Sequence, residues 1–195
     1  MLAEVQNWVR MRAPQVANPA IVLDIDETSL SNWKRIYRDD FAYIAKGACP
    51  LDNDRDPCGD IAWQPSEQAP AIAPTRDLYN FAQCADIAPP CQKIEVIFIT
   101  GRRENGPKVD TKTPREWTLR NLDKAGYKGI NPDHLYMRPD DSTGLVAPYK
   151  TDARADVEKR FNVTIIANVG DQESDLAGGH GERTFKASNP FYYIP

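Results

Sequence analysis

Three strongly apolar runs stand out along the chain, and each one ends at polar or glycine residues. The first run ends at Leu23 and is followed at once by two carboxylates, Asp24 and Asp26. The second covers residues 94–99, and the third covers residues 163–169. Short apolar runs with such boundaries are typical of strands that are buried on both faces, as in a parallel sheet.

Helical patterns lie between or beside these runs. Residues 113–125 have a proline near the expected helix start and are followed by Gly126, which is typical of a helix end. Residues 150–161 carry apolar side chains four positions apart, and residues 2–12 have the pattern of an amphipathic helix. Strands that alternate with helices predict an α/β fold, in which helices flank both faces of a parallel sheet.

The alternation breaks over residues 31–93, which are rich in proline and contain an aspartate-rich turn. A segment of this length without regular structure is usually functional when it lies inside a compact domain. We predict that residues 31–93 form a small cap inserted into a core made of residues 1–30 and 94–195. Within the cap we expect helices near residues 33–46 and 75–85.

All four cysteines lie in this predicted cap, and none belongs to a Cys-x-x-Cys pair. With only 2 histidines in the chain, a zinc site is not expected. Four cysteines allow three pairings, and the sequence does not choose between them. We favour the two local pairs, Cys49 with Cys58 and Cys84 with Cys91. Disulfides suit an oxidising compartment, and the alternative is four reduced thiols in a cytosolic protein.

Composition and charge restrict the partners of the protein. The formal net charge is -4 and no basic stripe is present, so a nucleic-acid polymer is not an expected partner. No apolar run approaches the roughly 20 residues of a membrane span. No hydrophobic targeting segment precedes Asn18, so an exported protein would have lost its signal from this sequence. Nothing in the sequence indicates the oligomeric state.

The residues at the ends of the apolar runs are the types that phosphoryl transfer needs. Asp24 is the predicted nucleophile, because aspartate can form an aspartyl-phosphate. Asp26 is predicted to protonate the leaving alcohol and then to deprotonate the attacking water. Thr100 would donate its hydroxyl to the phosphoryl group, and Lys150 would place a compact cation beside it. The transition state needs charge neutralisation and positioning more than covalent chemistry, and this set provides both.

The same acids predict a divalent metal. Two carboxylates at the end of a buried strand need a partner, because an isolated buried charge is costly. Mg²⁺ prefers oxygen ligands and shares them with substrate phosphate. The expected ligands are Asp24, the main-chain carbonyl of Asp26, and Asp171. Asp175 is expected either as a further ligand, direct or through water, or as a partner that orients Lys150.

The order and spacing of these residues resemble the four motifs of the haloacid dehalogenase superfamily of phosphohydrolases. The matching elements are Asp24-x-Asp26-x-Thr28, Thr100, Lys150 and Asp171-x-x-x-Asp175. Residues 24–32, the element at 170–175 and the tail at 185–194 resemble the acid phosphatase branch, subfamily IIIB. That branch includes bacterial secreted acid phosphatases and the plant vegetative storage proteins.

The resemblance implies a Rossmann-like core, Mg²⁺ dependence and hydrolysis of phosphate monoesters. It also implies a periplasmic or secreted location, which agrees with the reading of the cysteines. By the same resemblance Thr28 belongs to the substrate site. Backbone N–H groups of the Gly101 turn are expected at the phosphoryl group, and Arg102 either reaches the substrate or pairs with a surface acid.

Two other functions use the same residues. One is a phosphotransferase that passes the phosphoryl group from Asp24 to an alcohol. The other is a storage or binding protein with a vestigial site, although the motif residues are all present here. The substrate stays open between a nucleotide, a sugar phosphate and an aryl phosphate. Five aromatic residues of the predicted cap either form a wall over a base or aryl group or pack in the interior of the cap, and we favour the latter: Trp33, Tyr37, Phe41, Tyr43 and Trp63.

Overall fold

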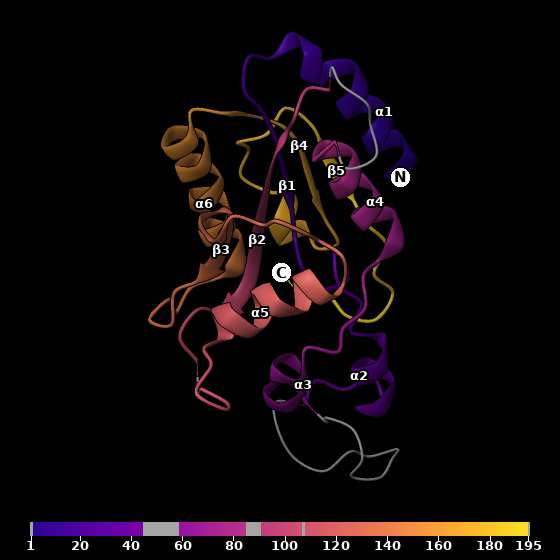
Figure 1. The fold of residues 1–195 in the computed structure, drawn as a ribbon. Coiled ribbons are helices and arrows are strands. Elements are labelled where there is room, and N and C mark those ends of the chain that lie inside the picture. Colours follow the sequence, from indigo (N-terminus) through magenta and orange to yellow (C-terminus); the bar gives the residue numbers. More distant parts are fainter. Residues whose placement is uncertain (1, 45–58, 85–90, 107, 195) are drawn as a thin grey trace.

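The computed structural model describes residues 2–44, 59–84, 91–106 and 108–194. Its centre is a sheet of five parallel strands in the order β3-β2-β1-β4-β5 (Figure 1). The strands are β1 Pro19–Leu23, β2 Glu95–Arg103, β3 Leu135–Arg138, β4 Thr164–Gly170 and β5 Thr184–Lys186. The three strands predicted from the apolar runs are confirmed. They occupy the centre of the sheet, where β1 lies between β2 and β4.

The two edge strands are not predicted from the sequence. β5 has three residues, of which only Phe185 is buried. β3 has four residues that alternate between buried and half-buried positions. Segments this short do not contain enough residues for a periodic pattern to identify them.

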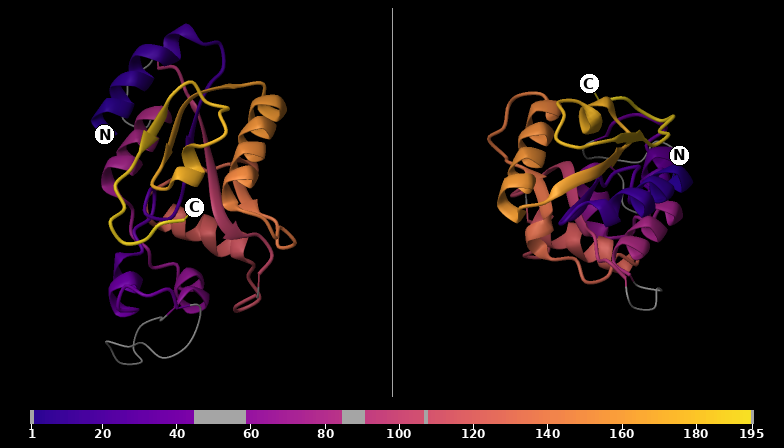
Figure 2. Two further views of the ribbon diagram at one scale, coloured as in Figure 1. Left: turned by 180° about the vertical axis from the view of Figure 1, so that it is seen from behind. Right: turned by 90° about the horizontal axis from the view of Figure 1, so that it is seen from above.

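Helices cover both faces of the sheet, as predicted (Figures 1 and 2). On one face, α1 Leu2–Arg12, α4 Ala73–Ala82 and α5 Pro114–Lys124 contribute to one hydrophobic core. On the other face, α6 Val146–Phe161 contributes to a second core that includes Val22. In β1 and β2 neighbouring residues face opposite cores, as the pleat of a strand requires. In β4 the neighbours Ile166 and Ala167 belong to the same core, next to an irregularity in the pairing with β1. Further short elements are α7 Glu173–Leu176 and the 3₁₀ helices Ala13–Gln15 and Pro132–His134.

The predicted helix at residues 113–125 is confirmed as α5. Thr113 caps it, and Glu116 completes a capping box. The helix expected at residues 150–161 begins earlier, at Val146, so Lys150 lies inside α6. Pro148 is compatible with this earlier start, because the N–H groups of the first turn have no partner within the helix.

Between β1 and β2 the described residues form three helices: α2 Trp33–Arg38, α3 Asp60–Ser66 and α4. α2 and α3 lie beyond the carboxyl-terminal ends of the strands, whereas α4 returns to pack beside α1 (Figure 1). α2 ends earlier than predicted, because Asp40 and Phe41 adopt left-handed backbone angles, with φ of 52° and 59°, that do not continue a helix. The boundaries of the cap stay a prediction.

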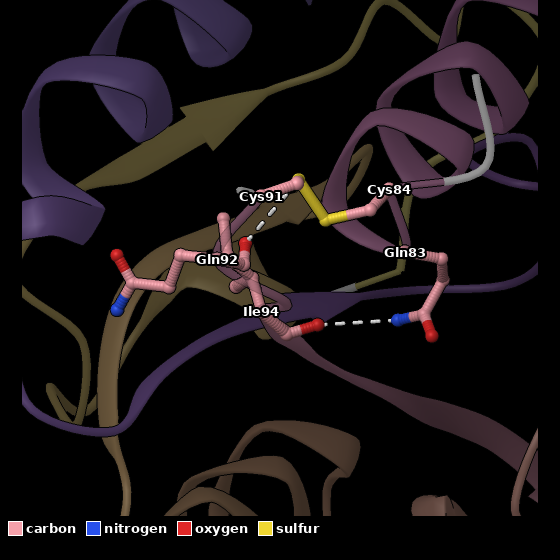
Figure 3. Close-up of a disulfide and its surroundings, with 5 residues drawn as sticks. All are labelled: Gln83, Cys84, Cys91, Gln92 and Ile94. Atoms are coloured by element: carbon pink, nitrogen blue, oxygen red, sulfur yellow. Dashed lines mark hydrogen bonds between the residues drawn. A yellow bond between two sulfur atoms is a disulfide. The ribbon is translucent and has the colours of Figure 1, made fainter. Parts of the chain in front are cut away.

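The predicted disulfide between Cys84 and Cys91 is present, and it joins the end of α4 to the segment before β2 (Figure 3). Gln83 reinforces this junction by donating to the carbonyl of Ile94 at 3.1 Å. The predicted pair Cys49 and Cys58 lies outside the described residues. In the described ranges no helix is both long and apolar enough to cross a bilayer.

Candidate active site

The carboxyl-terminal ends of β1, β2 and β4 meet at a cavity of about 460 Å³. Its lining includes most of the predicted site residues: Asp24, Asp26, Gly101, Arg102, Lys150, Asp171 and Asp175. The parallel sheet explains this convergence, because adjacent strands that run in one direction deliver their last residues to one edge. The backbone N–H of Asp24 donates to Val169 O at 3.0 Å, so Asp24 is held against β4 directly after β1 ends.

Lys150 joins two carboxylates from different elements, Asp24 directly after β1 and Asp175 on α7. Its Nζ lies 2.6 Å from Asp24 Oδ1 and also donates to Asp175 Oδ1. All three side chains are at most 7% exposed. Burial alone would lower the pKa of Lys150, but Asp24 and Asp175 raise it above its ordinary value. Burial and the nearby Asp175 raise the pKa of Asp24 well above the usual range, although Lys150 opposes this.

Asp171 is surrounded by hydrogen-bond donors. Thr28 Oγ1 donates to its Oδ1 at 3.0 Å, and Asn189 Nδ2 donates to its Oδ2 at 2.7 Å. Gln172 Nε2 also donates to Oδ2. Burial raises the pKa of Asp171, and the hydrogen bond from Asn189 counteracts part of this rise. The carboxylate orientation is therefore fixed from several sides.

The carboxylates of Asp24, Asp171 and Asp175 form the kind of donor set that binds a divalent cation. One oxygen from each lies within 4.8 Å of the others, and all three residues are buried. Lys150 is the ammonium group that contacts this cluster, so three carboxylates face one positive charge. The excess negative charge and the purely oxygen ligands fit a hard cation such as Mg²⁺. In this arrangement Asp175 is held by Lys150 and by the backbone N–H of Gln172 at 2.8 Å.

Arg102 pairs with Asp26, one of the two alternatives that the sequence left open, although it lines the cavity and does not lie on the outer surface. Its guanidinium donates to Asp26 through Nε at 2.9 Å and Nη2 at 2.6 Å. Asn32 adds a third bond to Asp26, from Nδ2 to Oδ1, at 2.8 Å. Burial alone would raise the pKa of Asp26, but the charge and hydrogen bonds of Arg102 lower it below its ordinary value.

Two predicted residues lie next to the cavity without lining it. Thr100 is completely buried, and its Oγ1 accepts from the backbone N–H of Arg102 at 3.2 Å. Thr28 is also buried and bonds Asp171, as described above. Gly101, the residue after Thr100, lines the cavity together with Val146, and a Cβ placed on Gly101 would lie 3.5 Å from Val146 Cγ1.

Gly170 is a site residue that sequence reasoning treated only as part of a motif. A Cβ placed on it would lie 2.2 Å from the Cβ of Asp175, which is closer than real atoms approach. Glycine is therefore required here for Asp175 to reach Lys150.

The aromatic residues of the predicted cap divide into two groups. Trp63 is buried, as expected, and its Nε1 donates to Asn32 Oδ1 at 2.7 Å. The other four are between 46% and 77% exposed, contrary to our expectation: Trp33, Tyr37, Phe41 and Tyr43. Phe41 and Tyr43 line the cavity, so part of this aromatic surface faces the site.

Several residues that contact the site were not singled out from the sequence. Asn32 and Glu27 fall within the motif at residues 24–32, and Gln172 falls within the element at 170–175. Asn189 and Tyr192 come from the tail at residues 185–194. The tail was noted for its resemblance to a family, which was the available signal, but no role followed from it.

The whole chain, residues 1–195, matches the haloacid dehalogenase superfamily, subfamily IIIB (acid phosphatase). It is 32% identical over 176 residues to Acid phosphatase 1 of Solanum lycopersicum, covering 89% of this chain and 58% of that protein. It is 37% identical over 134 residues to the Stem 28 kDa glycoprotein of Glycine max, covering 68% of this chain and 46% of that protein. Vegetative storage protein 1 of Arabidopsis thaliana is 30% identical over 177 residues, with coverage of 89% and 55%.

This chain therefore spans about half the length of these curated relatives. Among solved structures, the class C acid phosphatase from Bacillus anthracis superimposes with a TM-score of 0.64 at 19% identity. The superposition covers 98% of this chain and 78% of that one. At this identity the likeness establishes the fold.

Proposed function

Because this chain belongs to subfamily IIIB of the haloacid dehalogenase superfamily, we propose that it hydrolyses phosphate monoesters at the cavity described above. The observation that carries this proposal is the position of Asp24. Its carboxylate lies at the end of the central strand, faces the cavity and contacts Lys150 at 2.6 Å. An aspartate held in this way is suited to attack phosphorus.

In the proposed first step, an Asp24 oxygen forms a bond to phosphorus while the bond to the ester oxygen breaks. Asp26 gives its proton to the leaving alcohol. In the second step water attacks the aspartyl-phosphate, Asp26 takes a proton from it, and inorganic phosphate and free Asp24 are released. Lys150 balances negative charge throughout, and the backbone around Gly101 orients the phosphoryl group. Thr100, which does not line the cavity here, would hold this turn through its bond from Arg102 N and would have to become accessible to donate its hydroxyl to the phosphoryl group.

The contacts of Arg102 suggest that it controls the protonation of Asp26 in this scheme. It holds Asp26 through two hydrogen bonds and also lines the cavity. A phosphoryl group that enters the cavity competes with Asp26 for the guanidinium. Binding of substrate therefore loosens the contact that keeps Asp26 ionised, and it makes Asp26 a better proton donor.

We assign Mg²⁺ to Asp24, the main-chain carbonyl of Asp26, and Asp171, with Asp175 as the partner that orients Lys150. When bound, the ion would neutralise charge on the phosphoryl oxygens. The cluster of three buried carboxylates supports this assignment. The disulfide between Cys84 and Cys91 supports a periplasmic or secreted location.

A storage or binding role is the second candidate, because some relatives are named storage proteins or stem glycoproteins. The complete set of acidic residues and Lys150 favours the enzyme. A phosphotransferase would share every residue, and only analysis of the products with an added alcohol separates it from a hydrolase.

The test is release of inorganic phosphate from nucleoside monophosphates, sugar phosphates and para-nitrophenyl phosphate, with Mg²⁺ or EDTA. We expect release that needs the metal and is abolished in Asp24→Asn, while the fold is retained. No release from any of these esters would favour the storage or binding role. Release that survives the substitution would show that Asp24 is not the nucleophile.

A further inference from the structure

The chain beyond β5 turns back across the site. Ala187 N donates to Gly170 O at 2.7 Å, which extends the β4–β5 pairing by one step. The chain then reverses; in Figure 2 its end overlies the middle of the molecule in the left view and lies at the outer edge in the right view. We call residues 187–194 the C-terminal strap. None of its residues belongs to the two hydrophobic cores formed by the described residues. Its polar contacts go instead to residues that line the cavity, Asp171 and Gln172, and to the nearby residues Gly170 and Glu27.

The first contact is made by Asn189. Its Nδ2 donates to Asp171 Oδ2 at 2.7 Å, and its Oδ1 accepts from the backbone N–H of Phe191 at 2.9 Å. The second bond fixes which end of the amide faces Asp171, because only the NH₂ end can donate. Thr28 already occupies Asp171 Oδ1. The strap thus holds the second oxygen of a carboxylate that belongs to the proposed metal site.

The second contact is made by Tyr192. Its hydroxyl donates to Glu27 Oε2 at 2.6 Å. Glu27 is 5% exposed, and it also accepts from the backbone N–H of Asn32 at 2.6 Å and from its Nδ2 at 3.0 Å. The same Nδ2 donates to Asp26 Oδ1. Tyr192 is therefore connected to Asp26 through Glu27 and Asn32.

The third contact closes the strap. Ile194 N donates to Gln172 Oε1 at 2.8 Å, and Gln172 in turn donates to Asp171.

Glu27, the partner of Tyr192, has a left-handed backbone with φ of 57°, a strained conformation for a residue other than glycine. The bonds from Tyr192 and Asn32 hold the side chain of this strained residue.

We propose that the C-terminal strap is a positioning element of the active site. Asn189 holds Asp171 in the orientation that binds a divalent metal. Tyr192 holds Asn32, through Glu27, in the orientation that supports Asp26. The assignment rests on the proposed function, since it takes Asp26 and Asp171 as working groups of the phosphatase. It assigns two positioning residues that lie far from the motif residues in sequence.

The test of Asn189 is metal binding, which does not depend on turnover. We expect Asn189→Ala to weaken Mg²⁺ binding, measured by calorimetry on metal-free protein, by about tenfold or more, as is usual when the partner of a metal ligand is lost. The matched control is Asn18→Ala, which also loses a side-chain amide donor, here to Asn162 O at 3.0 Å, but directly before β1, at the opposite end of that strand from Asp24. Thermal unfolding of the metal-free variants should match the wild type.

Unchanged Mg²⁺ affinity in Asn189→Ala would overturn the role of Asn189, as would a wild-type protein that does not bind Mg²⁺. If the wild type binds Mg²⁺ but releases no phosphate, the proposed function fails while the metal test still decides the role of Asn189.

The test of Tyr192 is the split between kcat and KM. We expect Tyr192→Phe, which keeps the ring and loses the hydroxyl, to lower kcat by about tenfold with little change in KM. The control is Tyr136→Phe, which removes a hydroxyl bonded to the Asp156 carboxylate at 2.7 Å on the β3 side of the sheet. A change in thermal stability with unchanged kcat would show that the strap is only structural, and equal loss in both variants would also overturn the proposal.

Discussion

The cavity has two sides that differ in almost every physical respect. Its floor consists of charged groups held by hydrogen bonds: Asp24, Asp26 and Asp171 follow buried strands, and Lys150 reaches them from α6. Its roof is formed by α2, α3 and residues 39–44, and the exposed aromatic side chains of Phe41 and Tyr43 line the cavity there. In the proposed function, the floor would supply groups for chemistry that are fixed before substrate arrives. The roof would supply the surface that selects the organic part of an ester.

The floor should be the more sensitive side, and Lys150 its most sensitive residue. Lys150→Met leaves Asp24 and Asp175 buried without their cation. We expect a fall in kcat of about 10³-fold and a loss of about 3 kcal/mol in the unfolding free energy of the metal-free protein. Steady-state kinetics and urea unfolding measure both.

The matched control is Lys159→Met, which changes an exposed lysine on the same helix. If Lys150→Met and Lys159→Met change kcat and the free energy of unfolding equally, the buried ion pairs of Lys150 contribute to neither.

A backbone change in the floor should have the next largest effect. In Gly170→Ala the new Cβ would overlap Asp175, so the carboxylate must move away from Lys150. We expect kcat to fall by about 10²-fold, because small displacements of a positioned group are costly. The control is Gly144→Ala, where no atom lies within 4 Å of the added Cβ. A fully active Gly170→Ala would mean that Asp175 can be displaced without consequence.

Changes in the roof should act on substrate choice. We expect Tyr43→Ala to raise KM for para-nitrophenyl phosphate and nucleoside monophosphates by about fivefold, the size of a weak stacking contact. Its kcat, and its KM for a small alkyl phosphate, should stay near the wild-type values. Tyr37→Ala is the control, because Tyr37 is exposed but does not line the cavity. If Tyr43→Ala raised KM equally for aromatic and alkyl esters, the roof would not select the organic part of the substrate.

The smallest expected effect is on the free energy of unfolding, at the contact between α3 of the roof and α5 of the core. Glu67, at the end of α3, bonds Arg120 and Lys124 of α5. Burial alone would raise the pKa of Glu67, but these cations lower it. A pKa that is lower in the folded state stabilises the fold at neutral pH, and the effect disappears as the pH falls below the ordinary value.

We therefore expect Glu67→Gln to lose about 1 kcal/mol in urea unfolding at pH 7, and to match the wild type in acid. Glu104→Gln, which removes a more exposed pair with Arg115, should change stability less. A difference that persists in acid would point to packing and not to charge.

The same contrast explains what the sequence could reveal. The three central strands were predictable because burial on both faces leaves an uninterrupted apolar run. The floor was predictable because its residues follow those runs directly. β5 and the strap were not, because Phe185 is the one buried residue of a three-residue strand and Asn189 acts only after the chain has turned back.

The aromatic residues show another limit of pattern reading. Phe41 and Trp63 have the same apolar character in the sequence, yet one is 52% exposed at the cavity and the other is 1% exposed. Only the ending of α2 and the position of α3 decide which of them faces solvent. Local pattern carries no information on that choice.

The central place of β1 has a consequence for how the protein is made. During synthesis from the N-terminus, β1 emerges first, but its two neighbours begin only at Glu95 and Thr164. The strand that leads into Asp24 therefore has one or both edges unpaired until Thr164–Gly170 has been made. Pairings this distant slow folding and leave apolar strands open to aggregation. We expect yield in recombinant expression to depend on how quickly β4 follows β1.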